Sequence, residues 1–540
     1  MELSKRGIAD RTAFEQKGYA LPQFDREEMI VKTKKAPHWI HFGAGNIFRA
    51  FQANVMQELL NKGIMDTGLL VAEGFDYEII EKMNRPHDDL SILVTLKADG
   101  SIEKTVVGSI AESLILDSHR EVEFARLKEV FESPSLQMAS FTITEKGYSL
   151  VNGKGELLPA VSADFANGPS RCESYIGKVA SLLYYRYLHD KLPIAMVSMD
   201  NCSHNGDKLK AAVTAFADAW VGNGLAEEGF VRYVHDGSRV SFPWTMIDKI
   251  TPSPDMTVGA MLEKDGLHGF TPVRNERGTV TAPYVNAEET EYLVIEDSFP
   301  NGRLPLDKAG IIYTDRATVD KVERMKVTTC LNPLHTALAV YGYLLGYDRI
   351  WKEMKDEELV RLIKTIGYKE GLPVVTDPGI IDPKEFIDTV VNVRLVNPFM
   401  PDTPQRIATD TSQKLPIRYG ETIKAYMTSD TLDVKQLRMI PLVFAGWLRY
   451  LMAVDDNGNA FTPSPDPMLS EAQSYVASLR LGQHITAAAA MDKLSGLLSS
   501  EKVFGVDLVQ CGLAERVCEY FAELIAAPGA VRGTLKKYTM

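Results

Sequence analysis

The chain has 540 residues, of which 45% are hydrophobic and 24% charged. This composition is typical of soluble globular proteins, and because the length exceeds what one hydrophobic core supports, we expect two domains. The formal net charge is −13 and the basic residues form no stripe, which argues against a nucleic-acid partner.

Further sequence features bear on where the protein works. No stretch of about 18 uninterrupted apolar residues is present, so we expect no membrane-spanning segment. The opening MELSKRGIAD lacks the apolar centre of a signal peptide, which favours a cytoplasmic protein. The five cysteines contain no CxxC pair, so we expect reduced thiols, no disulfide and no structural zinc.

Strand and helix patterns alternate along the first part of the chain. Asp99 and Gly100 form a strong hairpin signal inside the alternating segment 90–114. Alternation of this kind builds a mainly parallel sheet covered on both faces, so we predict a Rossmann-type, doubly wound α/β domain over residues 1–302. The other predicted elements are strands at 68–76, 136–148 and 192–201 and helices at 120–133 and around 173–189.

Residues 303–540 show helical periodicity and no convincing strand, as in PLHTALAVYGYLLGY and EAQSYVASLRLG. We place the boundary near residue 300 because the segment DSFPNGRLPLDKAG supplies the proline and glycine typical of a linker. The sequence therefore predicts a mostly α-helical C-terminal domain.

The segment GAGNIFR, at 43–49, lies between a predicted strand and a predicted helix. Glycine lets the backbone approach a pyrophosphate, and the helix that follows directs free N–H groups at the anion. Phe48 stands where the third glycine of GxGxxG is expected, so the turn alone also fits an ordinary strand-to-helix connection. The candidate cofactor-binding residues are Gly43, Gly45, Asn46, Ile47, Phe48 and Arg49.

The next predicted strand ends in two acids, Glu73 and Asp76. Either carboxylate is able to accept a hydrogen bond from the adenosine ribose, and an acid at this position repels a 2′-phosphate. The sequence therefore favours NAD over NADP and leaves open which acid binds the ribose.

Several motifs occur in a fixed order from Gly43 to Arg418: GAGNIFRAF, TEKGY, MDNCSHNG, FPWTMIDKITP, a lysine followed by NPLH, and RIATDTSQKLPIR. In this ordered set the chain resembles the long-chain mannitol dehydrogenase family, which includes mannitol 2-dehydrogenase and the fructuronate and tagaturonate reductases. The resemblance implies hydride transfer between NAD(H) and a sugar alcohol or the matching keto sugar, without a metal.

The resemblance also assigns roles to residues. It makes Lys326 the acid–base group, Asn201 and Asn332 the amides that polarise the alkoxide, His335 a hydrogen bonder that orients the substrate, and Glu145 a gate for protons. Carbonyl reduction needs such a proton donor and such dipoles, and a buried lysine suits proton transfer near neutral pH. Taken singly, Lys326 would be a solvated helix residue and His335 a core histidine; the ordered motifs favour the catalytic interpretation.

The spacing departs from the family pattern by one residue, because Lys326 and Asn332 are six positions apart and the family lysine precedes its asparagine by five. Lys326 and His335 are then nine apart, which puts them on opposite faces of an unbroken α-helix at about 100° per residue. A one-residue π-bulge before Pro333 would remove the conflict, as would a new helix capped by Asn332. We favour the bulge.

The segment NVRLVNPFMPDTPQRIATDTSQKLPIR is unusually basic for an acidic protein. Charged runs are commonly solvated surfaces, but by resemblance Arg406 and Lys414 fall on positions that contact the substrate. A further arginine suits the carboxylate of a uronate better than a neutral polyol. Asp248 is expected to order side chains near the substrate. The candidate substrate-binding residues are Arg394, Arg406, Lys414, Arg418 and Asp248.

These observations predict an NAD-dependent reductase of a keto uronate, D-fructuronate to D-mannonate. Mannitol 2-dehydrogenase and tagaturonate reductase are alternatives with the same mechanism. A non-catalytic NAD-binding regulator is an alternative of another class, kept open by the extra residue before Asn332. The sequence leaves the oligomeric state open.

Overall fold

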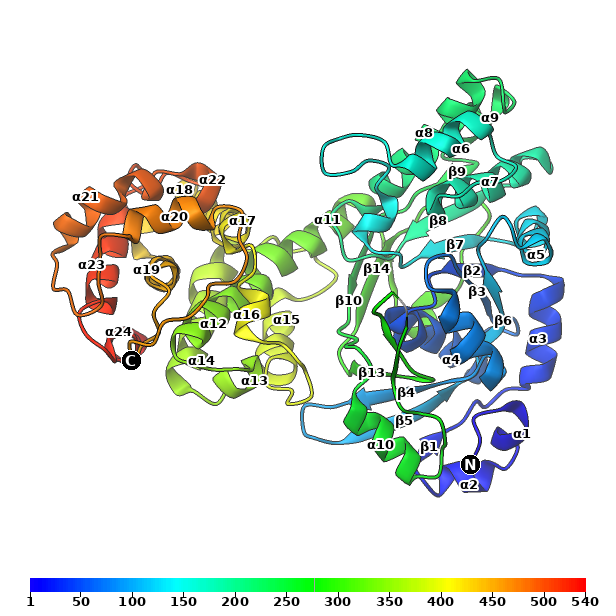
Figure 1. Ribbon diagram of the computed structural model, residues 1–540, viewed down its shortest axis with the longest axis horizontal. Helices are drawn as coiled ribbons and strands as arrows, with labels where there is room; N and C mark the ends of the chain where they lie inside the picture. Colours follow the sequence, from blue (N-terminus) through cyan, green and yellow to red (C-terminus); the bar gives the residue numbers. More distant parts are fainter. Residues whose placement is uncertain (276) are drawn as a thin grey trace. The chain divides into compact units, whose positions relative to one another are not determined.

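The computed structural model describes residues 1–275 and 277–540, which form two compact units. The first contains residues 1–97 and 101–320, and the second contains residues 98–100 and 321–540 (Figure 1). The boundary lies later than the expected position after residue 302. The reason is the short strand β15 (Ile312–Thr314), which pairs in parallel with β14 (Tyr292–Glu296) and so belongs to the first unit.

The first unit is built on a six-stranded sheet of the predicted Rossmann type. Its strand order is β6-β3-β2-β7-β8-β9, and every neighbouring pair is parallel. The order reverses beside β2, so the chain winds outward in both directions from that strand, as a doubly wound sheet requires. The strands are β2 (Trp39–Phe42), β3 (Leu69–Glu73), β6 (Ile110–Ile115), β7 (Met138–Phe141), β8 (Ile194–Ser198) and β9 (Val240–Ser241).

Successive residues of these strands face opposite sides of the sheet, and each side has its own hydrophobic core. Ile40 and Phe42 pack with α5 (Glu121–Glu132), α7 (Tyr175–Leu188) and α8 (Asn205–Gly222). Trp39 belongs to the other core, together with residues of α3 (Arg26–Lys35), the π-helical turn η1 (Phe48–Gln52) and α4 (Ala53–Asn61). Burial on both faces explains why these strands are continuously apolar.

The predicted hairpin at Asp99-Gly100 is confirmed. Strand β4 (Ser91–Leu96) pairs antiparallel with β5 (Ile102–Val107), and Gly100 adopts the positive φ of 86° that the turn requires. The hairpin belongs to a sheet with the order β1-β5-β4-β13. The remaining strands are β1 (Tyr19–Ala20), β10 (Thr245–Asp248), β11 (Val273–Arg274), β12 (Val280–Thr281) and β13 (Tyr284–Glu288).

The second unit is helical, and none of its residues, all of which the structure describes, forms a strand element. All residues of α19 (Met439–Leu451) are buried, which makes this helix the centre of the unit. No described helix of the chain is long and apolar enough to span a membrane. The longer helices around α19 are α12 (Asn332–Leu344), α14 (Glu357–Lys364), α18 (Glu421–Met427), α20 (Leu469–Val476), α21 (Ala487–Leu498), α23 (Ala514–Leu524) and α24 (Ala530–Thr539).

Candidate functional site

The glycine-rich turn begins where β2 ends, at the point where the strand order reverses. Gly43 has φ 104°, and a Cβ there would lie 2.3 Å from the carbonyl oxygen of Thr142, so only glycine fits. At Gly45 a Cβ would meet no described atom within 4 Å. The backbone at Gly45 therefore faces open space beside a helix N-terminus, as a pyrophosphate site requires.

Glu73 shapes this turn from the neighbouring strand. Its buried carboxylate accepts hydrogen bonds from the backbone N–H of Ala44 at 2.7 Å, Phe75 at 2.8 Å and Asp76 at 3.1 Å. Burial raises the pKa of Glu73, while these three N–H donors oppose the rise. Both oxygens of Glu73 are thus occupied by the main chain.

Asp76, the second candidate for the ribose, has a different environment. Its side chain accepts a 2.5 Å hydrogen bond from Nδ2 of Asn275, and the residue is 5% exposed. Burial raises the pKa of Asp76, and the charge of Arg277 acts in the opposite direction. The guanidinium of Arg277 lies over the exposed ring of Phe75, 4.4 Å from its centroid.

The helix that follows the glycine-rich turn buries its long side chains inside the unit. Phe48 is fully buried and stacks on His41, with ring centroids 4.5 Å apart, which accounts for an aromatic residue in place of the third glycine. Arg49 is also buried; its guanidinium donates to the carbonyl of Ala282 at 2.7 Å and to Oδ1 of Asn46 at 3.1 Å. Arg49 and Asn46 therefore hold the turn against the rest of the unit.

Asp200 joins the motifs TEKGY and MDN, which follow strands β7 and β8. Its carboxylate accepts from the backbone N–H groups of Ile143 and Thr144, both at 2.9 Å, and from the Tyr148 hydroxyl at 2.5 Å. Thr144 has φ 65°, a strained value for this residue type that the two bonds help to hold. Sequence reasoning missed Asp200, although its place between a buried strand and Asn201 was a signal.

Glu145 and Asn201 stand on the two turns that Asp200 connects, and both side chains are exposed. The Glu145 carboxylate pairs with the ammonium of Lys208 on α8. Asn205 extends the network, because its buried amide donates to the carbonyl of Asp200 at 2.9 Å and to the carbonyl of Thr245 at 3.1 Å. Thr245 begins strand β10, and Asp248, 6% exposed, ends it.

Lys326 opens a π-helical turn, η6 (Lys326–Cys330), in the second unit. The backbone N–H of Leu331 donates to the carbonyl of Lys326 at 3.1 Å, and Leu331 has φ −127° and ψ −60°, outside the helical region. A new helix, α12, begins at Asn332 with Pro333 in its first turn. The structure thus contains the expected π-turn, and a new helix also begins here, but Leu331 and not Asn332 occupies its cap position and no side chain caps it. Lys326 is 4% exposed.

His335 lies in the first turn of α12 and is almost buried, with 14% of its side chain exposed. Burial lowers the pKa of His335 to about 4; the charge of Asp402 acts against this shift, and the charges of Arg418, Arg406 and Arg394 add to it. The imidazole is therefore neutral at neutral pH. Its Nε2 lies 3.5 Å from Oδ2 of Asp402 and makes no hydrogen bond within the described residues.

The predicted cations have distinct surroundings. Arg394 is buried in the π-helical turn η9 (Val390–Arg394). Arg406 is 63% exposed and pairs with Asp402. Lys414 donates to the carbonyls of Ile407, at 3.0 Å, and Thr409, and burial lowers its pKa to about 8.

Arg418 connects the basic segment to helix α12. Its guanidinium donates to the Thr336 hydroxyl and to the carbonyl of Asn332 at 3.3 Å. Burial lowers the pKa of Arg418 to about 10, so the side chain stays charged at neutral pH. Arg418 therefore stabilises the first turn of α12, which carries Asn332 and His335. Its charge also acts on the imidazole of His335.

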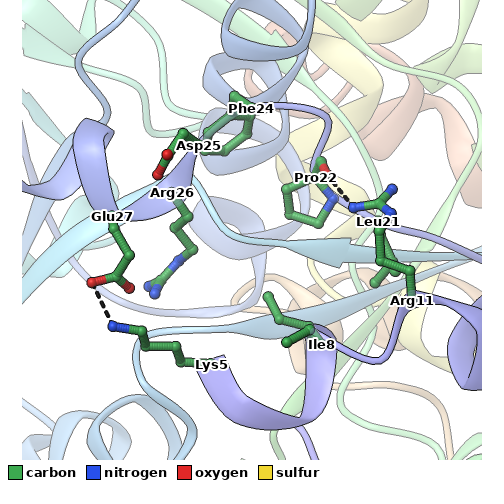
Figure 2. Close-up of a pocket in the computed structure, with 10 residues that line it drawn as sticks. Lys5, Ile8, Arg11, Leu21, Pro22, Phe24, Asp25, Arg26 and Glu27 are labelled. Carbon is green, nitrogen blue, oxygen red and sulfur yellow. Dashed lines mark hydrogen bonds and ion pairs between the residues drawn. The ribbon is translucent and has the colours of Figure 1, made fainter.

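A separate pocket of about 290 Å³ lies near the N-terminus of the first unit (Figure 2). Lys5 pairs there with Glu27 at 2.6 Å, and Arg11 donates to the carbonyl of Pro22 at 3.0 Å. Its described lining contains none of the predicted site residues. For that reason we assign it no part in the chemistry.

Comparisons with known proteins cover nearly the whole chain. The family model for the mannitol dehydrogenase Rossmann domain matches residues 37–308, and the model for the mannitol dehydrogenase C-terminal domain matches residues 318–525. D-mannonate oxidoreductase of Thermotoga maritima is 51% identical over 99% of both chains. D-mannonate oxidoreductase of Escherichia coli is 28% identical over 90% of this chain and 95% of that protein.

Solved structures agree with these matches. Pseudomonas fluorescens mannitol 2-dehydrogenase, in a ternary complex with NAD and D-mannitol, is 26% identical with a TM-score of 0.67 over 99% of both chains. A D-sorbitol dehydrogenase in substrate-free form is 24% identical, with a TM-score of 0.73 over 93% of this chain and 97% of that one, and shows the shared fold.

Proposed function

Because the chain belongs to the mannitol dehydrogenase family, we propose that it is an NAD-dependent oxidoreductase that reversibly reduces D-fructuronate to D-mannonate. The observation that carries this proposal is the 51% identity to the D-mannonate oxidoreductase of Thermotoga maritima over 99% of both chains. The similarity extends over both domains, so it includes the domain proposed to bind the cofactor and the domain proposed to bind the substrate. A cytoplasmic location, where NADH is freely available, completes the proposal.

The glycine turn fits NAD. Gly43 and Gly45 let the backbone approach the pyrophosphate, and the open side of Gly45 leaves room for it. Because the carboxylate of Glu73 already accepts hydrogen bonds from the backbone of the turn, Asp76 is the acid that accepts a hydrogen bond from the adenosine ribose hydroxyl. When bound, NADH supplies the hydride that reduces the sugar carbonyl.

The protein's own groups control the proton and the developing charge. In the roles that the family resemblance gives them, Lys326 donates the proton to the carbonyl oxygen, and the side-chain amides of Asn201 and Asn332 stabilise the developing alkoxide. His335 is neutral and binds a neighbouring sugar hydroxyl. Exposed Glu145, paired with Lys208, passes protons between Lys326 and solvent.

A uronate requires a cationic partner for its carboxylate. Arg406 and Lys414 supply it, because Arg406 is exposed and Lys414 carries an ammonium whose pKa of about 8 leaves it mostly charged at neutral pH. Arg394 and Arg418 add positive potential, and Arg418 also fixes the start of α12. Asp248 orders side chains near the sugar.

Mannitol 2-dehydrogenase is the second candidate, favoured by the Pseudomonas fluorescens structure, which holds NAD and D-mannitol. Tagaturonate reductase differs from our first assignment only in the sugar epimer. A regulator that binds NAD without turnover is the candidate of another class. The π-turn at Lys326 weighs against it, because it removes the spacing conflict on which that alternative rested.

Steady-state NADH oxidation with D-fructuronate, D-tagaturonate and D-fructose in parallel, each with a chelator present, tests the proposal. We expect D-fructuronate to give the highest kcat/KM and the chelator to have no effect. A preference for fructose would move the assignment to mannitol 2-dehydrogenase. Binding of NADH without turnover of any sugar would favour the regulator.

A further inference from the structure

Asp402 lies just before the short helix α16 (Pro404–Ile407), and only 8% of its side chain is exposed. The two carboxylate oxygens face different groups. Oδ2 lies 3.5 Å from Nε2 of His335, and Oδ1 pairs with the guanidinium of Arg406. The carbonyl of Asp402 also accepts from the backbone N–H of Ile350 at 3.0 Å, so the main chain fixes its position.

The position of Asp402 bears on which nitrogen of His335 carries the proton. A neutral imidazole has one N–H donor and one acceptor nitrogen, whereas a carboxylate only accepts. A hydrogen bond between the two groups therefore requires the proton to be on Nε2, the nitrogen that faces Asp402. Nδ1 is left as an acceptor, which suits a hydrogen bond from a sugar hydroxyl.

The distance between Asp402 and His335 is longer than a formed hydrogen bond, for which about 2.7–3.2 Å is typical. Hydrogen bonds of this kind are often long in a ligand-free enzyme and shorten when substrate binds. The same carboxylate pairs with Arg406 from a buried position, while the guanidinium itself remains exposed. One acid thus connects the imidazole to the cation of the basic segment.

We propose that Asp402 is a positioning residue that fixes the tautomer of His335 and the orientation of Arg406 for the sugar. This inference rests on the proposed function for the identity of the sugar, but the contacts that carry it lie wholly within the second unit. Charge, burial and the division of its two oxygens between two partners distinguish Asp402 from an ordinary surface acid.

Kinetics of Asp402→Asn test the role in turnover. We expect kcat/KM for the sugar to fall about 10- to 100-fold, as for other groups that orient a ligand-binding histidine, with KM for NADH unchanged. Asp402→Glu, which keeps the carboxylate, should recover part of the loss. Asp348→Asn is the matched control, because Asp348 is 62% exposed and pairs with Lys352 at 2.8 Å, away from His335.

A double-mutant cycle separates positioning from general structural support. In a His335→Gln, Arg406→Gln background, Asp402→Asn should change kcat/KM less than about threefold, because the two groups through which it acts are gone. An undiminished loss in that background would overturn the proposal. Thermal unfolding of each variant shows whether folding has changed.

Nitrogen NMR of the sugar-free protein with ¹⁵N-labelled histidine tests the tautomer and needs no catalytic activity. The His335 signals are identified by their loss in His335→Gln. We expect a neutral ring protonated at Nε2 in the wild type and a mixture of tautomers in Asp402→Asn. Protonation of the wild-type ring at Nδ1 would contradict the inference even if the enzyme reduced fructuronate.

Discussion

The backbone N–H of Leu331 donates to the carbonyl of Lys326, five residues earlier, at 3.1 Å. This π-type bond accommodates one more residue than an α-helical turn does, so the rule of about 100° per residue for an unbroken α-helix does not apply between Lys326 and His335. The break at Leu331 then starts α12 at Asn332. A local change of helix type, followed by this break, thus accommodates the extra residue between Lys326 and Asn332.

Lys326→Ala tests the proton donor directly. We expect kcat to fall about 10²- to 10⁴-fold, the range for general acid–base groups, with little change in the Kd for NADH measured by fluorescence. Lys321→Ala is the control, since Lys321 is an exposed residue of α11 (Arg316–Met325), one helical segment earlier. Comparable losses in the two variants would exclude a special role for Lys326.

Glu73 and Asp76 should differ when each is replaced. Glu73→Ala removes the acceptor of three backbone N–H groups, so KM for NADH and NADPH should both rise at least about tenfold. Asp76→Ala should instead lower the preference for NADH over NADPH, because the acid no longer repels the 2′-phosphate. The measurement is the ratio of kcat/KM for NADH to that for NADPH. An unchanged ratio in Asp76→Ala would show that a residue other than Asp76 contacts the ribose.

The pH profile should report Lys414. Burial lowers the pKa of its ammonium to about 8, so the charge is present below that pH and is lost above it. If this charge binds the uronate carboxylate, kcat/KM for the sugar falls as pH rises through about 8. In Lys414→Arg the side chain keeps its charge at all working pH values, so the decline of kcat/KM for the sugar should move to higher pH. Identical pH profiles for the wild type and Lys414→Arg would show that Lys414 does not bind the carboxylate.

Glu353 should reduce stability at neutral pH. The residue is fully buried, and neither carboxylate oxygen has a hydrogen-bond donor within the described residues; burial raises its pKa well above the usual value. The folded state favours the neutral acid, so the contribution of Glu353 to stability is most favourable below the unfolded-state pKa of about 4.3 and falls as pH rises above it.

Glu353→Met removes this ionisable group at similar volume. At pH 7 we expect the variant to be more stable by about 1–3 kcal/mol, with the advantage shrinking toward pH 4. Glu357→Met, at an 80% exposed side chain paired with Arg361, should change the free energy of unfolding little. Calorimetric unfolding across this pH range is the measurement, and a destabilised Glu353→Met would show that the carboxyl has a structural role.

The sheet, the hairpin and the helical second unit were predictable because their signals are local. Apolar strand runs, the Asp99-Gly100 turn and helical periodicity each act within about ten residues. The compact units divide at residue 320, later than the predicted domain boundary, since β15 has only three residues and is recognisable mainly through its pairing with β14.

The candidate site was predicted from ordered motifs, whereas the supporting acids were not. Glu73 appeared as a possible ribose ligand, but its contact with Ala44 arises only when the turn folds onto the strand. Asp200 and Asp402 likewise gain their roles from residues far along the chain, Thr144 and His335. Such partners depend on tertiary packing, which periodicity and spacing do not reveal.

The most direct test of the central claim follows one reaction by two methods. The purified protein is mixed with NADH and D-fructuronate, NADH absorbance is recorded, and the sugar product is identified by ¹³C NMR. The account predicts one D-mannonate formed for each NADH oxidised, at a rate that Lys326→Ala lowers about 10²- to 10⁴-fold. Bound NADH with unchanged fructuronate, or a product other than D-mannonate, would contradict it.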